Sequence, residues 1–161
     1  MKDSGAVSRP VRMEDAEDLQ RNILSRNTVE EVKDRINFYL GCYNKGIGIQ
    51  IIAEIDGEAI ASLELKKKNH PLYKHRAELF SLVVNPKHQR KGIARMLVKN
   101  AAEYAKEIGV EILEVGCRGG TPAETVYQKL GFAEYARLPR GIIDATANGN
   151  AFDEVRFYKL A

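Results

Sequence analysis

A short basic loop is the part of this sequence whose residue types and spacing point most directly to chemistry. It runs from Gln89 to Ala94, between the apolar run Leu79 to Val84 and a segment with helical periodicity. Backbone N–H groups at the start of a helix bind anions, and the helix dipole favours negative charge there. Gly92 and Ala94 are too small to keep a phosphate away. Positive charge is carried nearby by four side chains: Lys87, Arg90, Lys91 and Arg95. The loop is therefore predicted to bind an anion.

The loop does not belong to the two commonest nucleotide-binding patterns. It lacks the Walker spacing that ends in Gly-Lys-Ser or Gly-Lys-Thr, and it lacks the three-glycine dinucleotide fingerprint with an acidic residue about 20 positions later. Taken alone, the loop also fits a solvated basic helix start that binds no ligand. That alternative stays open on the residues of the loop alone.

Histidine and cysteine offer no second reactive centre. The only histidines are His70, His75 and His88, and the first two lie five positions apart in a Pro-containing loop without nearby acidic ligands, so no metal site is predicted. Cys42 and Cys117 are far apart and form no C-x-x-C pair, which argues against a disulfide framework or structural zinc. Cys117 lies in an apolar run without a nearby histidine, so it is expected to be a small buried residue rather than a nucleophile.

Length and composition place the chain among ordinary globular proteins. Its 161 residues, 44% apolar and 29% charged, suit a single domain spanning 1–161. The formal charge of +3 is too small to predict nucleic-acid binding. The N-terminus lacks the apolar stretch of a signal peptide, and no apolar run approaches the roughly 20 residues of a membrane span. We therefore expect a cytoplasmic protein with no membrane or nucleic-acid partner.

Five elements are expected before the loop. A Ser/Thr-x-x-Glu capping box marks the start of one helix, and a dipeptide that tolerates positive φ marks a hairpin turn. The elements are a strand from Val7 to Val11, a helix opening at Glu14, a helix from Thr28 that ends near Gly41 and Cys42, and strands Ile47–Ile55 and Glu58–Leu65 joined by Asp56-Gly57.

The elements that flank and follow the loop are expected to position it. The apolar run up to Val84 is predicted to be a strand buried on both faces and ended by Asn85-Pro86. The later elements are a helix from Gly92 to Gly109, a strand from Val110 to Cys117, a helix opened by a capping box of Thr121 and Glu124 and ended at Gly131, and strands Phe132–Leu138 and Phe152–Leu160.

Two segments in this setting resemble the GNAT superfamily of N-acetyltransferases. Gln89 to Ala94 is similar to that family's signature of Arg or Gln, two residues, Gly, one residue, then Gly or Ala. Ala123 to Phe132 resembles its A-x-x-x-Y-x-K-x-G-F segment at the expected distance downstream. The order of elements also resembles the family's over nearly the whole chain.

The resemblance implies a fold and an activity. The fold is α/β (mixed α+β): a central, mostly antiparallel mixed sheet of about seven strands with flanking helices, in which strands Leu79–Val84 and Val110–Cys117 are parallel and splayed. The implied activity is transfer of an acetyl group from acetyl-CoA to a primary amine of a small molecule, by direct attack in a ternary complex and without a metal. The alternatives are a protein or peptide N-acetyltransferase and a non-catalytic acyl-CoA sensor. The oligomeric state is left open, with a homodimer as one alternative.

The resemblance also assigns residues to the cofactor. Backbone groups of Leu82, Val83 and Val84 are expected to pair with the pantetheine arm. The pyrophosphate is assigned to Gln89, Arg90, Lys91, Gly92, Ile93, Ala94 and Arg95. Relatives often carry Asn at the position of Gly120, so that side-chain contact is missing here, and backbone groups of Gly120 are expected to replace it.

Two side chains are candidates for catalysis by the same resemblance. Tyr127 matches the tyrosine that donates a proton to the departing coenzyme thiolate, and Glu78 lies where some members carry a glutamate that accepts the amine's proton. The alternatives are a core tyrosine that is bonded to backbone, and a strand glutamate that is paired with Lys or Arg. The acceptor pocket is expected between the first two helices, Lys66 to His75 and Pro139 to Asn150.

Overall fold

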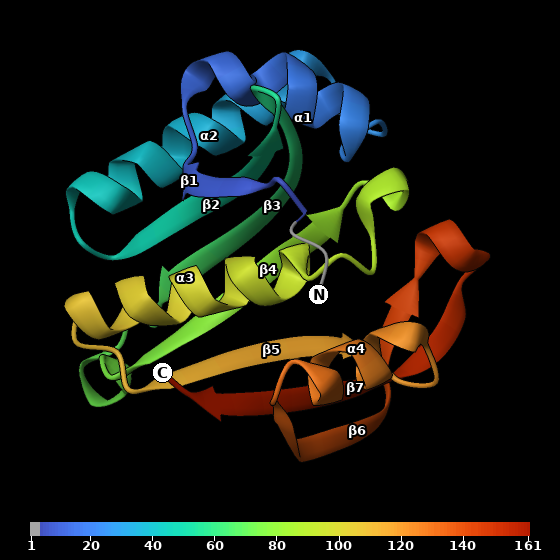
Figure 1. Cartoon of the computed structure of the whole chain (residues 1–161). Helices are drawn as coiled ribbons and strands as arrows, with labels where there is room; N and C mark the ends of the chain where they lie inside the picture. The colour runs from blue at the N-terminus through green and yellow to red at the C-terminus, as the bar shows by residue number, and fades with distance from the viewer. Residues whose placement is uncertain (1–3) are drawn as a thin grey trace.

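A seven-stranded mixed sheet runs through residues 4–161, the part of the chain that the computed structural model describes (Figure 1). The strand order is β1-β2-β3-β4-β5-β7-β6, and in this range β4 and β5 are the one parallel pair. Helix α3 (Ile93–Glu107) crosses one side of the sheet, whereas α1 and α2 pack mainly on β3 and β2 (Figure 1). This architecture confirms the expected fold class.

The first helices form largely as expected. Strand β1 (Val7–Pro10) leads through a short 3-10 turn to α1 (Ala16–Asn22), and α2 spans Val29–Asn44. Both bonds of the capping box are present, from the backbone N–H of Glu31 to the Thr28 hydroxyl and from that of Thr28 to the Glu31 carboxylate. The helix ends at Asn44, two residues beyond Cys42, near which its end was predicted. Cys42 belongs to the buried side of the last turn, at 4% exposure, so the helix continues past Gly41.

The predicted hairpin is confirmed. Strands β2 (Gly48–Ile55) and β3 (Glu58–Lys67) are joined by Asp56 and Gly57, whose φ angles are 52° and 81°. Positive φ at both central residues gives a turn whose twist matches that of the strands.

Strand β4 (Arg76–Val84) ends as predicted, but it is not buried on both faces. Ala77 and Leu79 lie in the core at 0% and 2% exposure, whereas Phe80 on the other face is 39% exposed. A run dense in apolar residues does not by itself indicate that both faces are covered. Here the helices that cover β1 to β3 leave this part of β4 open.

Strands β4 and β5 (Ile112–Arg118) separate soon after they meet. Their parallel pairing joins Arg76–Glu78 to Ile112–Glu114 and then stops. Beyond this point the β5-facing edge of β4 has no strand beside it within the described residues, as the predicted splay requires. A bulge near Ser81 changes the register of β4 on β3 in the same region.

Helix α4 (Pro122–Lys129) begins and ends as predicted, but its capping box is absent. The Thr121 hydroxyl donates to the carbonyl of Arg118, and the Glu124 carboxylate accepts from Arg137 on the next strand. A neighbouring carbonyl and a side chain of the next strand therefore bind the two side chains that the local pattern assigned to the cap.

The last two strands are longer than predicted. Strand β6 spans Ala133–Asp144 and β7 spans Asn150–Leu160, so much of the expected connection from Pro139 onward is strand. The register shifts between Leu138 and Ile142, and Arg140 takes a positive φ of 56° there. The irregularity explains why the predicted strand ends at Leu138 and not at Asp144, because it interrupts the alternation of side chains on which strand prediction depends.

Two apolar cores hold the sheet between its helices. The larger core lies under α3 and α4, where Leu97 and Phe157 are each 0% exposed. The smaller core joins α1 and α2 to the other face through Leu19, Ile36 and Ile52. The packing fixes the N-terminus of α3 against the end of β4, where the predicted anion-binding loop lies.

Candidate functional site

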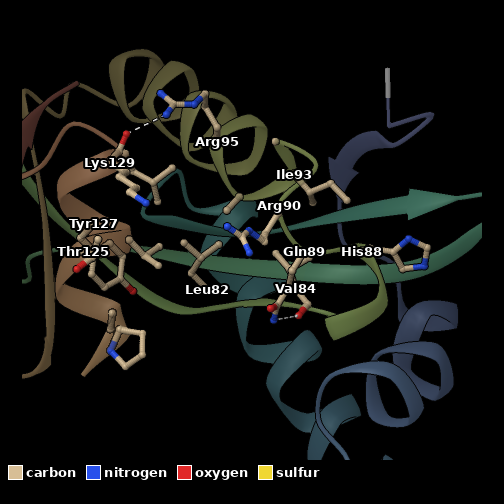
Figure 2. A pocket seen from close by; sticks show the side chains of 16 residues that line it. Leu82, Val84, His88, Gln89, Arg90, Ile93, Arg95, Thr125, Tyr127 and Lys129 are labelled. Carbon is tan, nitrogen blue, oxygen red and sulfur yellow. Dashed lines mark hydrogen bonds between the residues drawn. The ribbon is translucent and has the colours of Figure 1, made fainter. Parts of the chain in front are cut away.

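A pocket of about 860 Å³ opens between the start of α3, helix α4 and the end of β4 (Figure 2). Its volume is within the range of small-molecule sites. We call it the α3–α4 pocket. It is lined by Leu82, Val84, His88, Gln89, Arg90, Gly92, Ile93, Ala94, Arg95, Pro122, Ala123, Thr125, Val126, Tyr127, Lys129 and Leu130. The pocket thus brings together both segments that the sequence singled out.

The loop before α3 has the backbone of an anion-binding turn. Arg90 and Gly92 both take left-handed φ angles, 62° and 80°, and Gly92 is the N-cap of α3. No side chain caps this helix, and the first helical bond runs from Met96 to Gly92. Within the described residues, the N–H groups of Ile93, Ala94 and Arg95 therefore have no acceptor at the pocket wall. Such free N–H groups are the complement of phosphate oxygens.

The basic side chains of the loop divide into two groups. Arg90 lines the pocket, while Arg95 donates to the carbonyl of Lys129 at 2.9 Å and so joins α3 to α4 across the pocket (Figure 2). Lys91, which the sequence assigned to the pyrophosphate, does not line the pocket. Lys129 does, and the sequence analysis did not name it as a site residue. Lys129 lies in the second family segment, one turn after Thr125, and this position could have indicated that it lines the site.

The end of β4 provides the opposite wall. Leu82 and Val84 line the pocket, whereas Val83 does not, because alternate residues of a strand face opposite sides. The Gln89 side chain donates to the carbonyl of Val84 at 3.1 Å (Figure 2). Gln89 thereby fixes the turn between β4 and α3 and occupies one of the predicted pantetheine partners.

Tyr127 projects from α4 into the space in front of Leu82 (Figure 2). Its ring packs against Phe132 and Phe157, with centroid distances of 5.9 Å and 6.0 Å. Burial, with a smaller effect from the Cys117 thiol, raises the pKa of Tyr127 to about 12. The hydroxyl is therefore protonated at neutral pH, and it has no hydrogen-bond partner among residues 4–161. The backbone-bonded core tyrosine of the alternative is not what the structure contains.

Glu78 lies outside the α3–α4 pocket, at the last paired position before β4 and β5 separate. Its carboxylate accepts from Lys68 at 2.9 Å and from Arg156 at 2.7 Å. Burial acts to raise the pKa of Glu78, but these two cations outweigh it and the net pKa is lowered. Its side chain faces away from Ala77 and Leu79, on the side of the sheet opposite α3.

Gly120 is the last of the residues predicted to contact the cofactor. It does not line the pocket and has a φ of 74° in the turn before α4, so the contact of its backbone groups with the cofactor stays a prediction. Pro122, Ala123, Thr125, Val126, Leu130 and His88 line the pocket but were not named as site residues. Most of them belong to the second family segment, whose helical periodicity could have indicated that this face of α4 borders the loop.

A model of the Acetyltransferase (GNAT) family matches residues 15–132, which include both segments and the pocket. The chain belongs to the GNAT acetyltransferase family. Family membership carries acyltransferase chemistry with it. The resemblance of the two sequence segments is thereby confirmed.

Solved structures share the fold of this GNAT chain. The structure of yncA from Salmonella typhimurium with its cofactor acetyl-CoA has a TM-score of 0.79 and 18% identity, covering 97% of this chain and 94% of that one. Ribosomal-protein-alanine N-acetyltransferase from Brucella melitensis has a TM-score of 0.79 and 20% identity over 96% and 99%. A variant of spermidine N-acetyltransferase SpeG from Vibrio cholerae has a TM-score of 0.75 and 20% identity over 98% and 94%. A search of curated proteins finds no match.

Across residues 4–161, no group of three or more His, Cys, Asp or Glu side chains is arranged to hold a metal ion. None of the helices in the same range is long and apolar enough to cross a membrane.

Proposed function

We propose that this GNAT protein transfers an acetyl group from acetyl-CoA to a primary amine of a small molecule, by direct attack in a ternary complex. The observation that carries the proposal is one pocket that joins the uncapped N-terminus of α3 to the unpartnered hydroxyl of Tyr127. A phosphate site and a proton donor on the two sides of one pocket suit a phosphorylated thioester donor. The family and the acetyl-CoA in the yncA structure support the same reading.

The residues of the α3–α4 pocket fit acetyl-CoA as the donor. The free N–H groups of Ile93, Ala94 and Arg95 would hold its pyrophosphate, and Arg90 and Lys129 would add positive charge. The open edge of β4 from Leu82 to Val84 would pair with the pantetheine arm. When bound, acetyl-CoA supplies an activated carbonyl and a thiol leaving group.

Tyr127 is proposed to assist departure of the thiolate. Its hydroxyl is protonated, buried beside apolar rings and free to donate. Because its pKa of about 12 exceeds the ordinary thiol value of about 8.5, complete proton transfer is favoured only where the dry pocket also raises the thiol pKa. Hydrogen-bond donation to the developing charge needs no such match. Either way, removal of the hydroxyl would slow the chemical step.

Glu78 is proposed to receive the amine's proton, directly or through water. Its position where β4 and β5 part puts it beside the route from the opposite face of the sheet. The ion pairs with Arg156 and Lys68 make it a weaker base than an unpaired buried carboxylate. Its contribution is therefore expected to matter most at lower pH, where few amines are deprotonated in solution.

A screen of amines and peptides, scored by release of free coenzyme A, tests the function. A small amine that releases thiol in proportion to acetylated product supports it. Acetylation of peptides alone would favour a protein-directed enzyme. Binding of acetyl-CoA without acceptor-dependent thiol release would favour a sensor. The neighbours named above include enzymes directed at spermidine and at a ribosomal protein, so both acceptor classes belong in the screen.

A further inference from the structure

One face of the sheet carries several ionised side chains, and Glu78 is the one of them that has a role in the proposed chemistry. On β4 and β5 the paired residues Glu78 and Glu114 point to the same side, opposite the core residues Ala77 and Leu79. We call this side of β4, β5 and β7 the open face. Its main side chains are Arg76, Glu78, Phe80, Glu114, Arg156 and Tyr158.

The two buried carboxylates of the open face, Glu78 and Glu114, already have hydrogen-bond partners, whereas a third, Glu154, is 37% exposed and lies 3.9 Å from the Arg156 Nη1 atom. Arg76 makes two bonds of 2.7 Å to Glu114, and the Tyr135 hydroxyl adds one of 2.6 Å. Glu78 receives one bond on each of its oxygens, from Lys68 and Arg156. The two buried carboxylates also lie deeper than the cations. The Glu114 side chain is 2% exposed, beneath an Arg76 side chain that is 30% exposed.

The cations of the same face have donors left over. A guanidinium has five N–H groups and an ammonium three. Arg156 donates at 2.7 Å to Glu78 and at 3.5 Å to Tyr135, while its Nη2 atom is 3.9 Å from Glu114, too far for a hydrogen bond. Lys68 uses one donor, on Glu78. Arg156 and Lys68 therefore keep N–H donors that make no hydrogen bond within the described residues, and an anion with several oxygens would satisfy them.

Arg156 lies where an acceptor has to arrive. It pairs with Gly116 on β5, just beyond the last parallel pair of β4 and β5. A Cβ atom on Gly116 would approach the Arg156 Nη1 atom to 2.8 Å, so the guanidinium lies directly against the backbone of β5. The α3–α4 pocket occupies the other side of the sheet at this point. An amine that meets a donor held in that pocket therefore comes across the open face, past Arg156.

We propose that the acceptor is a small amine that carries a carboxylate, as an amino acid does, and that Arg156 and Lys68 bind this carboxylate on the open face. The inference rests on the proposed function and specifies its acceptor. Exposed Phe80, Tyr135 and Tyr158 offer apolar contact to the rest of the molecule. A polyamine is disfavoured, since its further ammonium groups would approach Arg156 and Lys68, which carry the same charge, and would have the exposed carboxylate of Glu154 as their counter-charge.

Matched pairs of amines test the inference. L-phenylalanine with 2-phenylethylamine, and L-leucine with 3-methylbutylamine, differ by one carboxylate, and spermidine represents a polycation. The wild type is expected to favour the carboxylated member by tenfold or more in kcat/KM, the discrimination that about 1.4 kcal/mol gives for a charged hydrogen bond. Arg156→Gln and Lys68→Gln should each lower the ratio within a pair about tenfold. Arg156→Lys should retain part of it.

The ratio separates recognition from catalysis. Both members of a pair use the same Glu78 and the same donor, so a general loss caused by disturbing Glu78 cancels. A second readout needs no turnover: calorimetric titration of L-phenylalanine into protein saturated with coenzyme A, which should bind about tenfold more weakly to Arg156→Gln. Arg12→Gln is the matched control, because Arg12 follows β1 at the opposite end of the sheet and its side chain is 61% exposed.

Each outcome decides one of the two claims. Equal ratios in wild type, a preference for spermidine, or no binding of any carboxylated amine would overturn the inference. If small amines are acetylated without preference for a carboxylate, the proposed function stands and only the inference fails. If no small amine of any class releases coenzyme A, the proposed function fails, and the titration still reports on Arg156.

Discussion

The buried carboxylate of Glu64 on β3 forms an ion pair with Arg35 of α2, with 3.5 Å between Oε1 and Nη1, beside the bulge that separates β4 from its regular pairing with β3. Ser81 holds a left-handed φ of 50°, a conformation that L-residues other than Asn and Asp seldom adopt. Glu64 is 5% exposed and pairs with Phe80 of β4 at the start of this bulge. The ion pair therefore joins α2 to β3 next to the segment of β4 that leads to Leu82 in the α3–α4 pocket.

We predict that Glu64→Leu weakens acetyl-CoA binding severalfold, because loss of the partly buried ion pair with Arg35, worth about 1 kcal/mol, lets the strained bulge of β4 beside it relax. Adding Ser81→Gly should restore most of the affinity, since glycine takes a φ of 50° without strain. Ser81→Ala is the matched control, because it removes the hydroxyl and leaves the strain. Calorimetric titration of acetyl-CoA checks the series. Rescue by Ala as well as Gly would contradict the strained-bulge account.

Tyr127→Phe should lower kcat by roughly a hundredfold or more and leave acetyl-CoA affinity nearly unchanged, the effect of removing a positioned proton donor. The ring and its contacts with Phe132 and Phe157 remain. Because the hydroxyl has no partner within residues 4–161, the melting temperature should change little. Steady-state kinetics and thermal unfolding of one preparation measure both. Near-normal turnover would remove Tyr127 from the mechanism.

Gly92→Glu is expected to abolish acetyl-CoA binding, since it puts a carboxylate at the N-cap of α3, where the pyrophosphate would lie. Part of any effect will come from the φ of 80°, which only glycine adopts readily. Gly57→Glu controls for that part, because Gly57 has a φ of 81° in the β2–β3 turn. Titration of folded Gly92→Glu protein with affinity equal to that of the Gly57 variant would refute the phosphate-loop assignment.

Glu78→Gln should cause a rate loss that shrinks as pH rises, because amines deprotonate unaided at high pH. Arg156 and Lys68 lower the pKa of Glu78 below its ordinary value of 4.5, so the wild-type carboxylate is already ionised at pH 5 and above. The acid limb of the wild-type profile should therefore reflect the amine and not Glu78. Profiles of kcat/KM from pH 5 to 9 provide the measurement. A loss of equal size at every pH would assign Glu78 a structural role.

Glu114 should contribute to stability in a pH-dependent way. Burial acts to raise its pKa, but hydrogen bonds from Arg76 and Tyr135 outweigh burial and lower the pKa to about 2. A carboxyl group whose pKa is lowered by folding stabilises the protein above its unfolded pKa near 4.5, and the stabilisation is lost as pH falls towards 2. Glu114→Gln should thus cost about 2 kcal/mol at pH 7 and roughly half of that or less near pH 3. Urea unfolding at both pH values measures this, and a pH-independent difference would contradict it.

Local signals in the sequence were enough for most elements and for half of the site. The Thr28 capping box, the Asp56-Gly57 turn and the Gly92 start of α3 each depend on atoms within a few residues of chain. Such features depend on local contacts alone, so the sequence pattern predicts them whatever the rest of the chain does. The family segment around Tyr127 then supplied the second wall of the pocket.

Tertiary structure decided what local patterns could not contain. The Glu124 carboxylate accepts a hydrogen bond from Arg137 and does not cap α4. The partners of Glu78 are Lys68, just after β3, and Arg156, 78 positions along the chain. The open face exists because α1 and α2 cover β2 and β3 but leave β4 exposed at Phe80. Ion pairs and burial of this kind depend on which strands become neighbours. The strand order is set by the packing of the whole sheet, so local patterns in the sequence do not reveal it.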